Sequence, residues 1–150
     1  MLKAVIRTHF HDYFCPYKKL GEGNFAEVYL AERKRDGQKV AVKAFSKKEI
    51  IGDRKGKESL WNEICIMRNI DSQNVVKLHG VYETSNSVYL VQEYAQGINL
   101  VKMLKRLPQV PLTHRKNIIR GLLKALKVLE EANILHRDLK PENIIYHGTE

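Results

Sequence analysis

The sequence predicts an α+β fold in which a five-stranded antiparallel sheet with one main helix comes first and a helical region follows. Two observations lead to this prediction. Between Tyr17 and about Gln92 the chain contains short alternating apolar and polar runs separated by turn residues, whereas from Asn99 onward apolar residues recur at helical spacing. With 150 residues, 43% of them hydrophobic, the chain is long enough to bury a core.

Five segments have the composition and alternation of strands, and mainly short links join them, which favours an antiparallel meander. The second and third segments are connected through Asp36-Gly37, a strong hairpin-turn signal. The predicted strands are Tyr17–Leu20, Val28–Glu32, Lys39–Phe45, Val75–Val81 and Val88–Gln92.

A single main helix is predicted between the third and fourth strands, from about Glu58 to Asn69. Leu60, Ile64 and Met67 fall on one face at helical spacing. Gly52 and Gly56 indicate that the residues just before this helix form a loop.

The second half of the chain predicts a short helix over Asn99–Leu107, two proline breakers, and a longer helix capped by Thr113 that runs to about Ala132. The apolar face of the longer helix is wide and needs a large packing partner. We therefore expect the face of helix 113–132 to be a candidate surface for a protein partner. Its apolar residues are Ile118, Ile119, Leu122, Leu123, Leu126 and Leu129.

Composition excludes several other classes of protein. The net charge of +9 is spread along the chain without an aromatic-interleaved basic stripe, so we expect no nucleic-acid partner. No apolar run is long enough for a membrane span, and the first residues lack the apolar stretch of a secretory signal. Cys15 and Cys65 have no partner motif, which favours a reducing compartment, the cytoplasm or the nucleus.

A glycine-containing turn, Leu20–Val28, lies between the first two predicted strands. Glycine lets the backbone approach a phosphate chain with its amide groups pointing at it. Because a strand follows this turn, it does not match a dinucleotide-binding fingerprint, and no Gly-Lys-Ser/Thr follows as in a Walker A loop. Gly-x-Gly turns also occur in many ordinary hairpins, so both interpretations stay open on this segment alone.

Lys43 ends the apolar run Val40-Ala41-Val42 and therefore needs an anionic partner if it is buried. Glu63, on the side of the following helix expected to be buried, is the natural carboxylate partner, and Glu58, one and a half turns earlier, is the competing candidate. The alternative is a lysine whose amine extends from an ordinary strand to water.

The segment from His136 to Asn143 is highly charged and lies between two apolar elements. Asp138 is a candidate acceptor for the proton of a hydroxyl nucleophile, and Lys140 could neutralise a transferring phosphoryl group. Asn143 offers an oxygen of the kind that Mg²⁺ prefers.

These motifs, in this order, resemble the eukaryotic-type Ser/Thr protein kinases over about residues 17–146. Lys140, two residues after Asp138, is typical of the Ser/Thr members. The segments Tyr82–Thr84 and Tyr89–Tyr94 are similar to the calcium/calmodulin-dependent group. The resemblance implies an N-terminal extension (1–16), a small lobe (17–94), a hinge (95–98) and the start of a helical large lobe (99–150).

The resemblance also implies ATP and Mg²⁺ as cofactors and a protein Ser/Thr hydroxyl as the substrate. Lys43 would hold phosphates and pair with Glu63 rather than Glu58. Asp138 would be the catalytic base, with Lys140 beside it, and Asn143 would bind metal. Gln92 would occupy the gatekeeper position, where a polar residue is uncommon. The other implied ATP-binding residues are Leu20, Gly21, Gly23, Val28, Ala41, Glu93, Ala95 and Ile145.

The Asp-Phe-Gly motif of this family does not follow within the 150 residues. The resemblance therefore implies a domain truncated before its principal metal ligand, and we expect little kinase activity from this chain alone. Two alternatives are a non-catalytic module that binds nucleotide or pairs with another kinase, and a fragment of a longer kinase.

Overall fold

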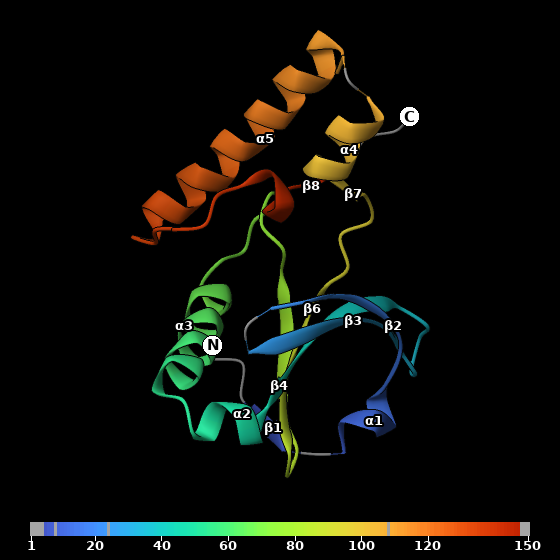
Figure 1. Ribbon diagram of the computed structural model, residues 1–150, viewed down its shortest axis with the longest axis vertical. Coiled ribbons are helices and arrows are strands. Elements are labelled where there is room, and N and C mark those ends of the chain that lie inside the picture. The colour runs from blue at the N-terminus through green and yellow to red at the C-terminus, as the bar shows by residue number, and fades with distance from the viewer. Residues whose placement is uncertain (1–4, 8, 24, 108, 148–150) are drawn as a thin grey trace. The chain divides into compact units, whose positions relative to one another are not determined.

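The computed structural model describes residues 5–7, 9–23, 25–107 and 109–147 (Figure 1). The chain divides into two compact units. The first combines residues 1–69 with 76–94, and the second combines 70–75 with 95–150.

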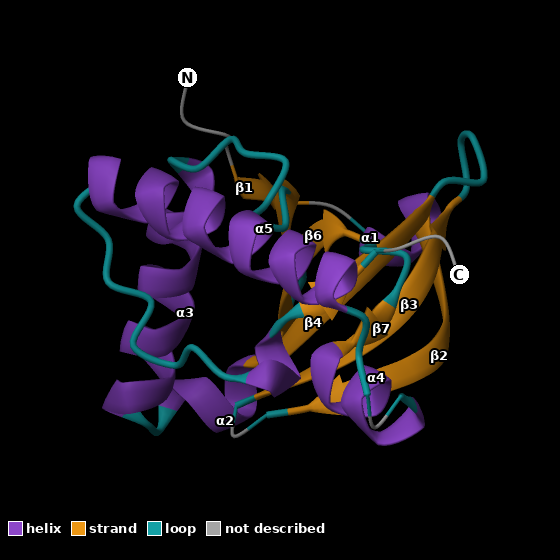
Figure 2. Ribbon diagram, turned by 90° about the horizontal axis from the view of Figure 1, so that it is seen from above, coloured by secondary structure: helices purple, strands orange, loops and turns teal. Residues whose placement is uncertain are grey.

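The first unit is built on a six-stranded sheet with the strand order β1-β5-β6-β4-β3-β2, and Figure 2 shows its long, twisted strands. The five predicted strands are present with shifted ends and pair with one another antiparallel, but they do not form a simple meander, because β6 lies between β4 and β5. A sixth strand, β1, was not predicted and pairs in parallel with β5. The strands are β1 (Val5–Arg7), β2 (Phe14–Glu22), β3 (Ala26–Arg33), β4 (Lys39–Ser46), β5 (Leu78–Glu83) and β6 (Ser87–Glu93).

The fourth predicted strand begins later than expected, at Leu78 instead of Val75. The residues before it form a turn, because the amide of Asn74 donates to the Ser72 hydroxyl (3.2 Å) and the amide of Val75 donates to the Ser72 carbonyl (3.4 Å). A side chain that bonds its own local backbone competes with strand pairing.

Two helices between β4 and β5 form the main helical layer of this unit. They are α2 (Lys47–Ile51) and α3 (Arg54–Arg68). The prediction of a loop before Glu58 was therefore wrong. The reason is close packing, since a Cβ on Gly56 would lie 3.2 Å from Cγ2 of Ile50, so the glycine lets α3 approach α2. Asp53 caps α3 by accepting a hydrogen bond from the Lys55 amide (2.8 Å).

Each face of the sheet has its own apolar core. On one face, α3 packs over a buried cluster to which Leu60 and Met67 add half-buried side chains, as predicted from helical spacing. The members of this cluster are Ala26, Phe45, Ile50, Ile64, Leu78, Val81 and Leu90.

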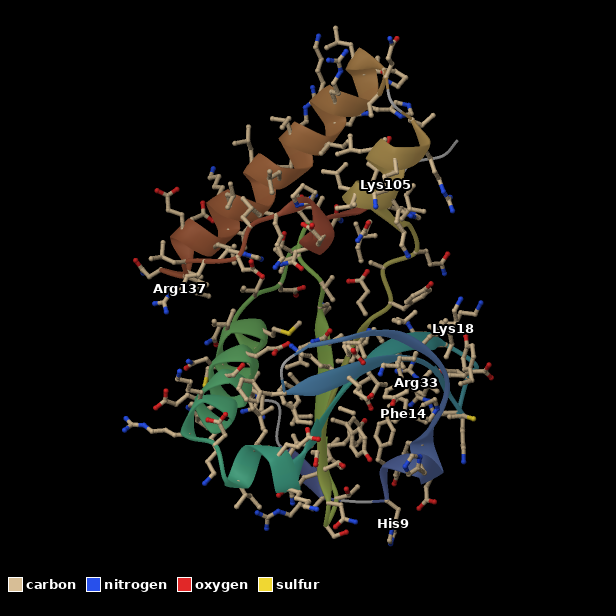
Figure 3. All side chains as sticks on the ribbon, in the orientation of Figure 1. His9, Phe14, Lys18, Arg33, Lys105 and Arg137 are labelled. Atoms are coloured by element: carbon tan, nitrogen blue, oxygen red, sulfur yellow. The ribbon has the colours of Figure 1, made fainter. Side chains whose placement is uncertain are left out.

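The opposite face is covered by a short helix, α1 (Phe10–Tyr13), and by the start of β2. Phe10 is fully buried there, and its ring stacks on Tyr89 with centroids 4.0 Å apart. Phe14, labelled in Figure 3, stacks on Phe10 at 5.1 Å. Phe10 and Phe14 therefore supply core side chains, although the resemblance implies an N-terminal extension that ends at residue 16.

The second unit contains β7 (Ile98–Asn99), α4 (Leu100–Arg106), α5 (Leu112–Glu131), a 3-10 turn η1 (Pro141–Asn143) and β8 (Ile145–Tyr146). Asn99 caps α4 by accepting a hydrogen bond from the Lys102 amide (2.9 Å). Thr113 does not cap α5, contrary to the prediction, because the helix already begins at Leu112 after Pro111.

The C-terminus of α5 closes with a left-handed residue, Asn133 (φ 56°). Its amide donates to the Glu130 carbonyl (2.9 Å), and the Ile134 amide donates to the Leu129 carbonyl (2.8 Å). This is the Schellman arrangement, which satisfies the last helical carbonyls and turns the chain toward the charged loop.

The apolar face of α5 is only partly covered. Leu129 is buried, whereas Ile119 and Leu123 are 54% and 60% exposed. A shallow groove of about 590 Å³ runs along this exposed side and is lined by Arg115, Lys116, Ile119, Arg120, Leu123, Lys124 and Lys127. Within the described ranges, the model contains no helix with the length and apolar character needed to cross a membrane.

Candidate functional site

The glycine-containing turn connects β2 and β3 in the first unit. Gly21 pairs with Val28 across the two strands, and Leu20 falls at a break in their register. The amide of Gly23 donates to the Ala26 carbonyl (2.8 Å), which closes the turn. Nothing lies within 4 Å of the position that a Cβ would occupy on Gly21, so the main chain here is open to an approaching group.

A cluster of ion pairs that was not predicted connects the two strands of this hairpin. The Lys19 amine lies 2.6 Å from carboxylate oxygens of both Glu22 and Glu27, and the Tyr29 hydroxyl donates to Glu27 (2.6 Å). Hydrogen bonds from Lys19 and then Tyr29 hold the pKa of Glu27 below its usual value. Antiparallel pairing of β2 with β3 is the signal that could have revealed this cluster, because it places Lys19 near Glu27.

Four of the predicted nucleotide-binding side chains share one face of the sheet. Val28 pairs with Lys43 between β3 and β4, and Ala41 pairs with Gln92 between β4 and β6. Positions two apart on a strand point to the same side, so all four side chains lie on the face that α3 covers. Ala41 and Val28 thus form an apolar surface next to the Lys43 side chain.

The predicted partner of Lys43 is present on α3. The Lys43 amine lies 2.6 Å from a carboxylate oxygen of Glu63, and the two side chains are 27% and 22% exposed. The amine also lies 5.3 Å from the centroid of the Phe45 ring. Glu58, the alternative partner, instead pairs with Arg54 (2.8 Å) on the exposed side of α3.

The end of β6 leads into the predicted hinge. The Glu93 amide donates to the Lys77 carbonyl (2.8 Å), and Ala95 is the first residue of the second unit after Tyr94. Gly97 lies against β8 so closely that a Cβ would overlap the carbonyl oxygen of Tyr146. Only a glycine allows this approach, which places Ile145 opposite Asn99 in the β7–β8 pair.

The charged loop after α5 brings three predicted residues together within the second unit. The Lys140 amine lies 2.9 Å from the Asp138 carboxylate. The Asn143 side-chain amide donates to the Asp138 carboxylate (3.0 Å) and to its main-chain carbonyl (2.9 Å). Arg137, labelled in Figure 3, has φ 63°, a conformation that a non-glycine residue adopts at some cost.

These contacts favour the charged form of Asp138. Hydrogen bonds from Lys140 and then Asn143 hold the pKa of the Asp138 carboxyl below its usual value, so the side chain is a carboxylate at neutral pH. The same contact with Asp138 raises the pKa of Lys140. The loop therefore presents a charged proton acceptor with a cation beside it.

Substitution of Lys140 by methionine is expected to raise the pKa of Asp138 toward its usual value, because the strongest hydrogen bond to the charged form is lost. The measurement is an NMR titration of the Asp138 carboxyl carbon in both proteins. Lys127→Met, which removes a lysine that pairs with Glu131 (3.8 Å), is the matched control and should leave Asp138 unchanged. An Asp138 titration that is identical in Lys140→Met and the unsubstituted protein would contradict this assignment.

The donor chemistry of the loop fits a hard divalent cation. The amide nitrogen of Asn143 faces Asp138, so its side-chain oxygen is directed elsewhere and has the character that Mg²⁺ prefers. No group of three or more His, Cys, Asp or Glu side chains suited to a metal occurs in the part of the chain that the structure describes. A magnesium ion held by Asn143 would therefore need further oxygen ligands, such as those of a bound phosphate chain.

Comparison with known proteins yields a consistent set of relatives. Residues 14–150 match the family model for the protein kinase domain. A Serine/threonine-protein kinase ATG1a from Arabidopsis thaliana is 36% identical over 88% of this chain and 21% of its own length. A Calcium/calmodulin-dependent protein kinase type 1 from Caenorhabditis elegans is 39% identical over 86% of this chain and 36% of its own length.

A third relative, Serine/threonine-protein kinase DCLK3 from Mus musculus, is 37% identical over 99% of this chain and 18% of its own length. The chain thus spans about a fifth to a third of the length of these relatives. The presence of a calcium/calmodulin-dependent kinase among them agrees with the similarity noted in the sequence.

Proposed function

The chain belongs to the protein kinase family, and we propose that it supplies the nucleotide-binding and proton-accepting residues for ATP-dependent phosphorylation of protein serine and threonine hydroxyls. The observation that carries this proposal is the ion pair between Lys43 and Glu63 (2.6 Å) on the face of the sheet that holds Val28 and Ala41. Its relatives named as serine/threonine-protein kinases support the choice of hydroxyl substrate.

In the first unit, Lys43 would bind the phosphate chain of ATP as a point charge. Glu63 holds the Lys43 amine in place from α3, so the cation does not have to be ordered when nucleotide binds. Val28 and Ala41 offer an apolar surface for the adenine ring, and the open space beside Gly21 would let the phosphates approach the main chain.

In the second unit, Asp138 would accept the proton of the attacking serine or threonine hydroxyl. The Asp138 side chain is charged at neutral pH, as an aspartate ordinarily is, and Asn143 holds its carboxylate by a hydrogen bond of 3.0 Å. Lys140 lies beside this carboxylate and would stabilise negative charge that develops on the transferred group. Asn143 would contribute an oxygen to Mg²⁺, which neutralises phosphate charge when it is bound.

Nucleotide binding by the purified chain tests this function directly. Lys43→Met should weaken the affinity for Mg-ATP about 10- to 100-fold, because a hydrogen bond to a charged group contributes about 1.5–3 kcal/mol. Isothermal titration calorimetry measures the change. Lys116→Met, which removes an exposed lysine of α5, is the matched control and should bind as the unsubstituted chain does. Equal affinity of Lys43→Met and the unsubstituted chain would rule out the proposed role of Lys43.

A second candidate is a non-catalytic module that pairs with another protein through α5. The exposed Ile119 and Leu123 within the basic groove favour it, because an apolar stripe of this kind is a candidate contact surface. Dimerisation that depends on concentration, measured by analytical ultracentrifugation, together with no detectable binding of Mg-ATP, would favour this candidate over the kinase.

A further inference from the structure

Gln92 is a polar residue in an apolar part of the sheet. Its strand neighbours are Leu78 of β5 and Ala41 of β4, and Leu78 is 1% exposed. A half-buried side-chain amide in such surroundings requires hydrogen-bond partners, since an unsatisfied one costs free energy. The partners that it finds both lie on α3.

The Gln92 amide nitrogen donates to a carboxylate oxygen of Glu63 (3.4 Å) and to the sulfur of Met67 (3.2 Å). The orientation of the amide follows from chemistry, because an ionised carboxylate and a thioether only accept hydrogen bonds. Met67 lies one helical turn after Glu63, so one side chain of β6 contacts two successive turns of α3.

The two oxygens of Glu63 have different partners. One oxygen contacts the Lys43 amine at 2.6 Å, and the other accepts the hydrogen bond from Gln92. The carboxylate is therefore held from two strands, β4 through Lys43 and β6 through Gln92. A carboxylate held at both oxygens has fewer orientations available than one held at a single oxygen.

We propose that Gln92 is a positioning residue that holds Glu63, and with it α3, in the orientation that pairs with Lys43. Gln92 acts through Glu63 and Met67, and this action does not require it to touch nucleotide. The consequence for ATP binding rests on the proposed function, whereas the effect on the Lys43–Glu63 pair exists in the nucleotide-free chain.

The test uses the reactivity of the Lys43 amine in the nucleotide-free chain, followed by mass spectrometry after brief treatment with an acylating reagent. The Lys43 amine must separate from the Glu63 carboxylate before its nitrogen can attack the reagent. It therefore reacts slowly while the two side chains are paired. Gln92→Met keeps the length of the side chain and removes the donor. It should raise the acylation rate of Lys43 about 2- to 10-fold, the effect of one hydrogen bond of about 0.5–1.5 kcal/mol.

A double-mutant cycle separates positioning from simple packing. In a Glu63→Ala background Lys43 should already react fast, and adding Gln92→Met should change its rate no further. Gln73→Met, at an exposed glutamine, is the matched control and should leave Lys43 unchanged. If Gln92→Met raises the rate equally with and without Glu63, or does not raise it at all, the positioning role is wrong.

The double-mutant cycle tests the role of Gln92 independently of the proposed function, because the acylation rate of Lys43 is measured without ATP. A chain that shows the expected coupling but fails to bind Mg-ATP would retain the positioning role and lose the nucleotide-binding role. A chain that binds Mg-ATP without the coupling would retain the proposed function and overturn the role of Gln92.

Discussion

Substitution of Asp138 by asparagine is expected to lower the rate of phosphoryl transfer from ATP about 10²- to 10⁴-fold, the usual contribution of a positioned general base. Asparagine keeps the shape of the side chain and an oxygen that can accept the hydrogen bond of Asn143. It cannot accept the proton of the hydroxyl nucleophile. The loss should therefore fall on the rate of transfer, with the affinity for Mg-ATP nearly unchanged.

The measurement is single-turnover transfer of labelled phosphate to a serine- or threonine-containing peptide. It is made with this chain together with any residues that follow Glu150 in the natural protein. Glu142→Gln, which removes the same charge from an exposed neighbour in the loop, is the matched control and should retain activity. An Asp138→Asn protein that transfers phosphate at the unsubstituted rate would show that Asp138 is not the base.

The second large effect is expected at Phe10, where alanine should lower the free energy of unfolding of the first unit by about 3–5 kcal/mol. Phe10 is fully buried, stacks on Tyr89 and Phe14, and meets the edge of Tyr82 at 6.0 Å. Removal of its ring leaves a cavity between α1 and the sheet that these rigid aromatic neighbours can fill only in part.

Urea denaturation followed by circular dichroism measures this loss. Tyr13→Ala is the matched control, because Tyr13 lies on the same short helix but is 51% exposed, and its substitution should cost about 0.5 kcal/mol or less. A loss of similarly small size at Phe10 would mean that residues 10–14 are not part of the cooperative fold, and an extension ending at residue 16 would then describe them better.

The proximity of the charged residues in the loop after α5 could be predicted from the sequence, because these residues are separated by only a few positions. The loop from Asp138 to Asn143 spans few residues, and its contacts are local, so the residues predicted together are found together. The hairpin at Asp36-Gly37 follows in the same way from turn chemistry, and the chain there forms the turn between β3 and β4.

Contacts between segments that lie far apart in the chain were harder to predict from the sequence. The sequence favoured Glu63 over Glu58 as the partner of Lys43 from the expected faces of the helix, and the resemblance to kinases supported that preference, but only the structure gives the contact of 2.6 Å. The hydrogen bond from Gln92 to Glu63 was not predicted at all. Both depend on how α3 is rotated over the sheet, and helical spacing determines which residues share a face but not which strand residue each one meets.

The sequence alone determined the order of the motifs and the succession of sheet and helices, since periodicity and turn preference act over a few residues. Only the tertiary structure decided that β1 pairs with β5, as at Val5 and Val81, and that Phe10 completes the core of the opposite face. Those partners lie far apart in the chain. No turn joins them directly, so turn geometry does not fix their register, and packing against the rest of the unit selects them.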